Sequence, residues 1–207
     1  MESARYGIYL IPPPALVHAL AVAHAVLRAA FGARTAGQFM PHCTIKGFTL
    51  LRGDVSPDEL LPALDAVFAR TAAFETEIYP PWVSEVGQRG VSVLLWLRRS
   101  EVLDHLHQDV WDVVRPRVAP DCRFTAVEPL GPDFAPHLSL VQADLPAEPG
   151  LLAQGLRLCQ HVYDTLPAHT FVARDLQLIE FGADDWDGAW WDTLRYRQLR
   201  GWTLRDP

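Results

Sequence analysis

Short apolar runs alternate with longer amphipathic stretches along the chain, a pattern that predicts a mixture of strands and helices. The first apolar run ends at Pro12-Pro13-Pro14, and the helix predicted from residue 56 begins with a cap residue, a proline and two acids, Ser56-Pro57-Asp58-Glu59. The predicted strands are residues 6–10, 42–50, 74–79, 91–97 and 137–141, one within 170–181, and 190–199; the predicted helices are residues 15–31, 56–71, 100–114 and 151–166.

The order of these elements repeats. Each half of the chain reads strand, helix, strand, helix, strand, and only the last strand has no counterpart. The middle strand of each half opens with a similar motif, Pro41-His42-Cys43-Thr44 in the first and Pro136-His137-Leu138-Ser139 in the second. This is a weak internal duplication in sequence. Two such halves, packed around a pseudo-two-fold axis, would place the two motif strands side by side in one domain that spans residues 1–207.

The two motifs carry the residues of a phosphate site. Side chains alternate between the faces of a strand, so His42 shares a face with Thr44. By the same rule His137 shares a face with Ser139, and the residues between them point toward the core. A hydroxyl can donate a hydrogen bond to a phosphate oxygen, and an imidazole can take or give a proton near neutral pH. We expect one histidine to deprotonate the attacking water and the other to protonate the departing oxygen, without a metal ion or other cofactor.

These motifs give the sequence its resemblance to a known family. His42-Cys43-Thr44-Ile45 and His137-Leu138-Ser139-Leu140 resemble the paired H-x-T/S motifs of the 2H phosphoesterase superfamily, which includes bacterial 2′-5′ RNA ligase-like proteins and plant-type cyclic nucleotide phosphodiesterases. The resemblance implies a bilobal α+β fold. Two pseudo-symmetric lobes of antiparallel sheet, flanked by helices, would line a central cleft, with the first motif in the N-terminal lobe and the second in the C-terminal lobe.

The resemblance also implies an activity. Family members open cyclic phosphates, typically 2′,3′-cyclic phosphates of nucleosides or short RNA ends, to 2′-phosphomonoesters, and some act on ADP-ribose 1″,2″-cyclic phosphate. The residues that inherit the catalytic roles by matching the motif are His42, Thr44, His137 and Ser139. The match does not settle which histidine is the base; we expect His137 to activate water and His42 to protonate the leaving oxygen. RNA 2′-5′ ligation, and binding of nucleotides or RNA without turnover, stay open as alternatives.

Further substrate contacts are expected beside the motifs. Lys46 is the one lysine among 18 basic residues, and it continues the face of the first motif, so its ammonium would balance phosphate charge. Aromatic rings can stack on a base. Phe48 lies one step further along that face, Phe134 lies just before the second motif, and Tyr9 lies in a strand that borders the cleft. Trp82 follows two prolines in a predicted loop and is another candidate.

Composition and charge limit the possible binding partners and the cellular compartment of the protein. The net charge of −7, from 25 acidic and 18 basic residues, weighs against long duplex nucleic acid and modestly against a ligase that must hold two RNA ends. It permits a short RNA end or a single nucleotide. The cysteines show no CxxC spacing and the N-terminus shows no secretion signal, so we expect free thiols in the cytoplasm. We expect a monomer without a membrane span. The other histidines, which include His24 and His107, show no motif of a functional site.

Overall fold

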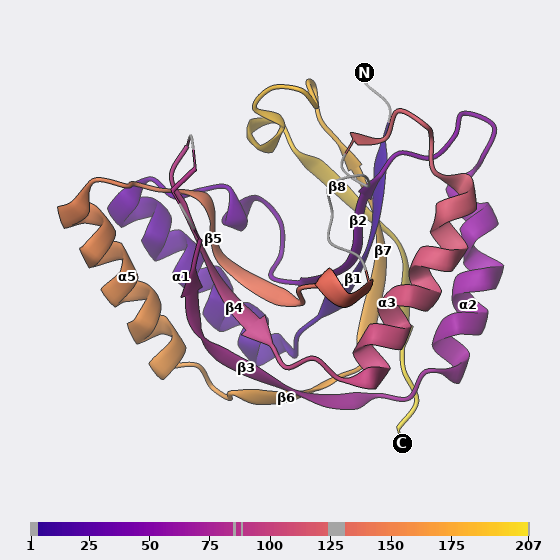
Figure 1. Ribbon diagram of the computed structural model, residues 1–207, viewed down its shortest axis with the longest axis horizontal. Helices are drawn as coiled ribbons and strands as arrows, with labels where there is room; N and C mark the ends of the chain where they lie inside the picture. Colours follow the sequence, from indigo (N-terminus) through magenta and orange to yellow (C-terminus); the bar gives the residue numbers. More distant parts are fainter. Residues whose placement is uncertain (1–3, 85, 88, 124–130, 207) are drawn as a thin grey trace.

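The computed structural model describes residues 4–206 apart from residues 85, 88 and 124–130. Within this part of the chain the strands are β1 (Arg5–Ile11), β2 (Cys43–Thr49), β3 (Phe74–Val83), β4 (Val91–Leu97), β5 (His137–Leu145), β6 (Thr170–Ala173), β7 (Asp175–Gly182) and β8 (Arg195–Thr203), and the α-helices are α1 (Pro14–Phe31), α2 (Leu61–Arg70), α3 (Glu101–Val114) and α5 (Pro149–Asp164). The strands form one antiparallel sheet in the order β6-β3-β4-β5-β2-β1-β7-β8, which curls into a half-barrel (Figure 1). The predicted α+β fold class is confirmed.

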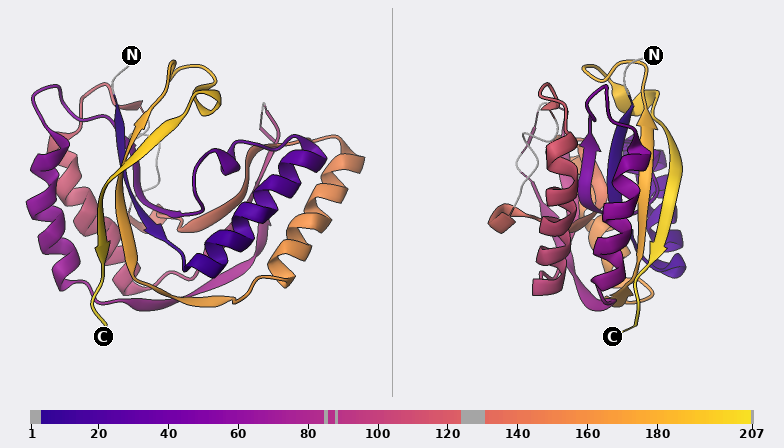
Figure 2. Two further views of the ribbon diagram at one scale, coloured as in Figure 1. Left: turned by 180° about the vertical axis from the view of Figure 1, so that it is seen from behind. Right: turned by 90° about the vertical axis from the view of Figure 1, so that its right-hand side faces the viewer.

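The helices flank the curled sheet in two pairs (Figure 2). α1 and α5 lie together against β5 and β3, whereas α2 and α3 lie together against β8 and β2. Apolar residues at helical spacing, such as Leu103, Leu106 and Val110 of α3, are buried in the core between helices and sheet. Each helix pair therefore covers one side of one half of the sheet and leaves the other side turned toward the hollow of the half-barrel.

Local signals set where the helices begin and end. The Ser100 Oγ accepts a hydrogen bond from the backbone N–H of Leu103 at 3.2 Å, which caps α3. Ser56 and Glu59 form a capping box at the 3₁₀ turn that leads into α2. α1 ends at Gly32, whose φ of 72° lies in the left-handed region that glycine tolerates. These signals account for the agreement between the predicted and the observed helices.

α1 is the one helix of the described residues that is long and apolar enough to cross a membrane, with a mean hydropathy of 1.5 over 18 residues. A core helix of a globular protein passes the same test. Leu16, Leu20 and Leu27 of α1 are buried against the rest of the core. Its outer side exposes Val22 and Val26 at 49% and 44%.

The two lobes of the sheet do not correspond to the two halves of the chain. One lobe is β2-β1-β7-β8 and the other is β6-β3-β4-β5, so each contains strands from both halves. The two lobes are also not separate sheets, because β2 pairs with β5 and joins them, with Cys43 opposite Leu138. The prediction that the two motif strands lie side by side is confirmed.

Strand boundaries differ from the prediction at three places. β3 continues through Pro80 and Pro81 to Val83, where the sequence predicts a loop; a register shift against β4 lies at these prolines, which cannot donate to a regular ladder. Residues 170–181 form two strands, because β6 pairs with β3 and β7 pairs with β1. The last strand begins at Arg195, and residues Trp190–Asp192 form a 3₁₀ turn.

Two apolar clusters hold the fold. The larger one fills the space between the sheet and its helices and includes the central residues of both motifs, Cys43 and Leu138. The smaller one is aromatic and lies on the opposite side of β1 and β7, with Tyr9, Phe39 and Phe181 among its buried members. The hollow of the half-barrel therefore has an aromatic wall next to the motif strands.

Candidate active site

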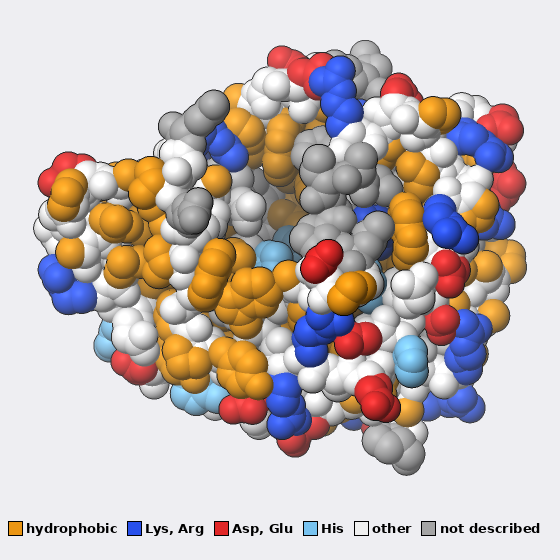
Figure 3. All heavy atoms as spheres, viewed as in Figure 1, with side chains coloured by type: hydrophobic (Ala, Val, Ile, Leu, Met, Phe, Trp, Pro, Cys, Tyr) orange, Lys and Arg blue, Asp and Glu red, His pale blue; other side chains and the backbone are white. Residues whose placement is uncertain are grey.

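The pairing of β2 with β5 assembles the two motifs. Their central residues face each other and are buried on the helix-covered side, so their neighbours point to the other side. This register sets His42 opposite Ser139. It also sets Thr44 opposite His137, so the two imidazoles lie diagonally across the strand pair. Figure 3 shows histidine side chains at the hollowed centre of one face of the molecule.

Each motif imidazole is tied to the backbone through the same atom. Nδ1 of His42 lies 2.7 Å from the carbonyl oxygen of Met40. Nδ1 of His137 lies 2.7 Å from the carbonyl oxygen of Ala135. A carbonyl only accepts, so both Nδ1 atoms carry the proton, and in the neutral ring Nε2 keeps its lone pair. The proline before each histidine restricts the preceding residue to an extended conformation, which holds the accepting carbonyl in place.

Burial makes both imidazoles hard to protonate. Desolvation lowers the pKa of His42 from 6.5 to about 4; the hydrogen bond to Met40 raises it, and the nearby His137 and His24 lower it. Desolvation also lowers the pKa of His137 below 6.5, opposed by its backbone hydrogen bond. Both rings are therefore neutral near pH 7. An anion that enters the hollow would favour the protonated form of one of them.

Two further histidines, on helices, hold the motif strands. His107 of α3 donates from Nδ1 to the carbonyl oxygen of Ile45 at 2.7 Å. His24 of α1 donates from Nε2 to the carbonyl oxygen of Ser139 at 2.8 Å. Both carbonyls lie where strand pairing is irregular, because a register shift follows Thr44 in β2 and another follows Ser139 in β5. A bulge disrupts the ladder of backbone hydrogen bonds, and each histidine supplies a donor at that place.

His24 and His107 belong to no motif that identifies them in the sequence. Their exposed fractions are only 8% and 1%. The available signal was a polar residue inside a buried apolar stripe, as where His107 follows Leu103 and Leu106 on the inner side of α3. A buried polar group needs a hydrogen-bond partner, but the sequence does not show which carbonyl a strand irregularity makes available.

The prediction that Lys46 continues the face of the first motif is wrong. Between Thr44 and Lys46 the pairing advances one residue on β1 but two on β2, and this extra residue reverses the alternation. Lys46 is fully buried, and its Nζ lies 5.0 Å from the ring centroid of Trp111 on α3. Its charge contributes to the lowered pKa of His107. The structure therefore places Lys46 against α3 and does not bring it to the histidine pair.

Phe48 returns to the side of the hollow through a second irregularity. The pairing between Lys46 and Thr49 advances three residues on β2 for two on β1, and Phe48 has a φ of 49°, which is rare for a bulky residue. The ring of Phe48 lies 4.9 Å from that of Phe181 and 5.1 Å from that of Trp190. It thus lies on the side of the first motif and packs within the aromatic wall, although simple alternation does not describe its path. A contact of Phe48 with substrate stays a prediction.

Tyr9 and Phe134 lie at different positions relative to the histidine pair. The ring of Tyr9 lies edge-on to that of His42 at 4.8 Å, but only 1% of Tyr9 is exposed, so it supports the imidazole from within the aromatic wall. Phe134 is 6% exposed and stacks on His107 with ring centroids 3.9 Å apart. Phe134 therefore supports a residue that holds β2 and is not brought to the histidine pair.

Two tryptophans stand beside the second motif. Trp96 lies opposite His137 in the pairing of β4 with β5, and their ring centroids are 6.1 Å apart. The ring of Trp82, which is 46% exposed, lies 5.5 Å from that of Trp96. The sequence gives no signal for Trp96, because residues 91–97 are an almost continuous apolar run that predicts a buried strand. Only the pairing with β5 shows that Trp96 shares a side with His137.

Gln142 contacts the hydroxyl of the second motif. The Ser139 Oγ donates to the Oε1 of Gln142 at 3.2 Å. β5 bulges just beyond this point, where Ala143 has a φ of 59°. The amide nitrogen of Gln142 is then able to donate to a ligand that reaches Ser139.

The cysteine thiols are less reactive than the side chains of the two motifs. Burial raises the pKa of the Cys43 thiol to about 12, and does the same for Cys159, so neither is a thiolate at neutral pH. Among the residues that the structure describes, no cluster of three or more His, Cys, Asp or Glu side chains could hold a metal ion. The imidazoles and hydroxyls of the two motifs are thus the reactive groups that the fold brings together.

The chain is similar in sequence to one known family. The family model described as "2'-5' RNA ligase superfamily" matches residues 12–185. No curated protein matches the chain in sequence.

Solved structures share the fold at low sequence identity. The Thermus thermophilus protein TT0787 is 16% identical over 98% of both chains, with a TM-score of 0.61. The apo form of E. coli LigT is 15% identical over 100% of both chains, with a TM-score of 0.56. E. coli LigT complexed with 3′-AMP is 17% identical over 99% of this chain and 100% of that one, with a TM-score of 0.51. At such identities the likeness shows the fold alone.

Replacing His107 tests its role in holding β2. His107→Leu keeps an apolar volume but leaves the Ile45 carbonyl without this donor, so we expect the free energy of unfolding to fall by about 1–3 kcal/mol in urea denaturation. His105→Leu, on the exposed side of the same helix, is the matched control and should stay within about 0.5 kcal/mol of the wild type. Equal losses in the two variants would contradict this role.

The lowered histidine pKa values predict how stability depends on pH. His42 has a pKa of about 4 in the folded chain and 6.5 when unfolded, so the unfolded state binds more protons as the pH falls below 6.5. We expect the free energy of unfolding to fall between pH 7 and pH 5, with His42 contributing on the order of 1–2 kcal/mol. Urea denaturation of wild type and His42→Gln at both pH values measures this contribution. A fall of the same size in both proteins would contradict it.

Proposed function

Because the chain belongs to the 2′-5′ RNA ligase superfamily, we propose that it is a metal-independent phosphoesterase that opens 2′,3′-cyclic phosphates of nucleosides or short RNA ends to 2′-phosphomonoesters. The observation that carries the proposal is the pair of imidazoles on adjacent strands, each with Nδ1 bound to a backbone carbonyl and Nε2 available. General acid–base catalysis needs two such groups on opposite sides of the reacting phosphate.

In this mechanism the surroundings of the two rings identify the base. His137 and His24 lower the pKa of His42 in addition to its burial, whereas burial alone lowers that of His137, so we assign the neutral ring to His42. His42 Nε2 would accept a proton from water as its oxygen forms the new bond to phosphorus. The bond from phosphorus to O3′ breaks, and protonated His137 gives its Nε2 proton to that oxygen. This order is the reverse of the assignment expected from the sequence, and exchange of protons with solvent restores the starting state.

The hydroxyls of Thr44 and Ser139 complete the site. Each shares the side of its histidine and can donate to a non-bridging phosphate oxygen, whose charge grows as water attacks. Support for a nucleotide ligand comes from E. coli LigT, which has been solved in complexes with 3′-AMP and with phosphate and which shares this fold. The exposed ring of Trp82, next to Trp96 and His137, offers a surface on which a base can stack.

RNA 2′-5′ ligation is the second candidate, favoured by the description of the matching family model. It would use the same imidazoles, but a ribose 5′-hydroxyl would attack the cyclic phosphate in place of water. The new bond from phosphorus to O5′ would form a 2′-5′ diester as the bond to O3′ breaks and that oxygen takes up a proton. The net charge of −7 weighs against it, because a ligase must hold two RNA ends at once. For hydrolysis, ADP-ribose 1″,2″-cyclic phosphate is an alternative substrate.

Product analysis distinguishes these reactions. The protein is incubated in EDTA with each nucleoside 2′,3′-cyclic phosphate, with ADP-ribose 1″,2″-cyclic phosphate and, separately, with tRNA halves. We expect the product to be a 2′-phosphomonoester, which phosphorus NMR detects. We also expect kcat/KM to fall by at least about 100-fold in His42→Ala and in His137→Ala. Joined tRNA halves without hydrolysis would establish the ligase instead, and full activity of either variant would refute the paired mechanism.

The pH profile tests the acid–base pair. The base must be neutral, so kcat/KM should rise with pH through the His42 pKa of about 4. The acid must be protonated, so kcat/KM should fall as pH rises through the His137 pKa, which lies below 6.5. We expect a bell-shaped profile with its maximum on the acidic side of pH 6.5. A profile that climbs to a plateau in alkali would rule out catalysis by this pair.

A further inference from the structure

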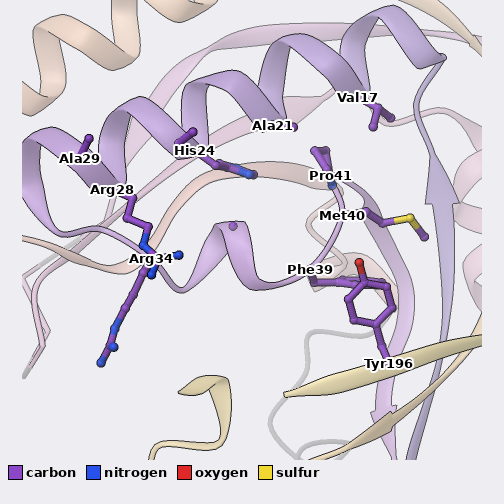
Figure 4. Close-up of a pocket in the computed structure, with 12 residues that line it drawn as sticks. Val17, Ala21, His24, Arg28, Ala29, Arg34, Phe39, Met40, Pro41 and Tyr196 are labelled. Carbon is purple, nitrogen blue, oxygen red and sulfur yellow. The ribbon is translucent and has the colours of Figure 1, made fainter. Parts of the chain in front are cut away.

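A second hollow adjoins the histidine pair. It has a volume of about 670 Å³ and lies between α1, the segment that leads into β2, and Tyr196 of β8. Seen from behind in the left panel of Figure 2, α1 and β8 stand on either side of the short turn Ala36–Gln38. We call this space the rear pocket and define it by His24, Arg28, Arg34, Phe39 and Tyr196, which line it (Figure 4).

The rear pocket shares its inner wall with the candidate active site. The ring of Phe39 lies 4.5 Å from that of His42 on one side and 4.8 Å from that of Tyr196 on the other. His24 lines the pocket and also donates to the carbonyl of Ser139. Two independent contacts, one to each motif, therefore connect the rear pocket with the histidine pair.

The lining combines an aromatic surface with positive charge. Tyr196 is 47% exposed, so part of its ring is open to a ligand. Arg28 and Arg34 both line the pocket. Within the described residues the guanidinium of Arg28 has no ion-pair partner, and that of Arg34 pairs with Asp192 at 3.0 Å on the surface, where such a pair is weak and exchangeable. The ligand that fits carries a planar ring and an anionic group.

We propose that the rear pocket binds a second nucleotide of a single-stranded RNA whose terminal cyclic phosphate lies at the histidine pair. This inference rests on the proposed function. The base of that nucleotide stacks on Tyr196, and its phosphate contacts Arg28. RNA is the nucleic acid concerned because a 2′,3′-cyclic phosphate requires a ribose with both hydroxyls. The preferred substrate is therefore the end of an oligonucleotide and not a free mononucleotide.

The charge distribution agrees with a short strand. The chain as a whole carries −7, which repels a long phosphate backbone. The rear pocket instead gathers two arginines in a hollow that shares a wall with the histidine pair. A contact with one or two phosphates beyond the reacting one fits this local charge.

Binding and turnover are measured with two matched probes. One is an RNA trinucleotide that ends in a 2′,3′-cyclic phosphate, and the other is the corresponding mononucleotide. Their 2′-phosphate products serve in competition binding against a fluorescent copy of the trinucleotide product. The variants are Arg28→Ala, Tyr196→Ala and Tyr196→Phe, and Arg157→Ala is the control, because Arg157 is likewise an exposed helical arginine but lies on α5, outside the pocket.

We expect the wild type to prefer the trinucleotide by about tenfold or more in kcat/KM and in Kd. Arg28→Ala should weaken trinucleotide binding by about fivefold and lower the slope of log Kd against log salt by about 0.7. Tyr196→Ala should weaken it by about tenfold, and Tyr196→Phe should restore it because the ring remains. The mononucleotide should respond to none of these changes, and Arg157→Ala should behave as the wild type.

Several outcomes would overturn the inference. Equal affinity for the two probes, no effect of Arg28→Ala, or an equal effect of Arg157→Ala would show that the rear pocket is not an RNA subsite. If the mononucleotide is hydrolysed without any preference for the trinucleotide, the proposed function stands and the subsite fails. If no cyclic phosphate is hydrolysed but trinucleotide binding still depends on Arg28 and Tyr196, the subsite stands and the proposed function fails.

Discussion

The pairing of β2 with β5 is the contact on which the rest of the site depends. It joins the two lobes into one sheet, and Cys43 and Leu138, its central pair, are buried under the helices. A slip of one residue would turn the motif histidines and hydroxyls into the apolar core and bring apolar side chains to the hollow. The cost of burying those polar groups without partners therefore favours the register that assembles the site.

The two motif strands are held by matching devices. Each motif imidazole donates from Nδ1 to the carbonyl two residues earlier, and each strand is irregular just after its hydroxyl residue. A helix histidine then donates to a carbonyl at each irregularity, His107 in β2 and His24 in β5. The weak duplication in sequence thus becomes a close correspondence in hydrogen bonding. His24 and His107 position the strands, whereas His42 and His137 face the hollow.

The environment of the histidines also suits their proposed chemistry. Desolvation keeps both rings neutral in the free protein, and a phosphate that enters would raise the pKa of whichever ring it meets. Tyr9 packs against His42 and Trp96 stands beside His137, so the two rings have different neighbours. His137 and His24 also lower the pKa of His42, whereas no charged neighbour among the described residues lowers that of His137, and this difference is a physical basis for separate roles as base and acid.

Much of the fold followed from local patterns in the sequence. The helices were predicted from apolar spacing and caps, and the meeting of the two motifs was predicted from the repeated order of elements. Along β2, side chains stop alternating regularly between the two faces of the strand beyond Thr44. The cause is a bulge, which depends on the partner strand and leaves no local signal in the sequence. This is why Lys46 was placed on the wrong side. Trp96 was missed for a related reason, since only its pairing with His137 shows which way it faces.

Local sequence patterns also could not predict which strands belong to which lobe of the sheet. The sequence halves predict two lobes of their own, but β3 leaves the lobe of β1 and β2, and β7 and β8 join that lobe from the other half. Which strands pair across the chain depends on the packing of the whole sheet. The carbonyl partners of His24 and His107 could not be predicted for the same reason, because both lie on strands distant in sequence.

The most direct test of the acid–base pair is nitrogen NMR of the protein with ¹⁵N-labelled histidine. The spectrum reports the tautomer and the protonation state of each ring. The account predicts that His42 and His137 are both neutral at pH 7 with the proton on Nδ1, and that a bound nucleoside 2′-phosphate protonates His137 before His42. A proton on Nε2 in the neutral ring, or a charged His42 beside a neutral His137 in the complex, would contradict it.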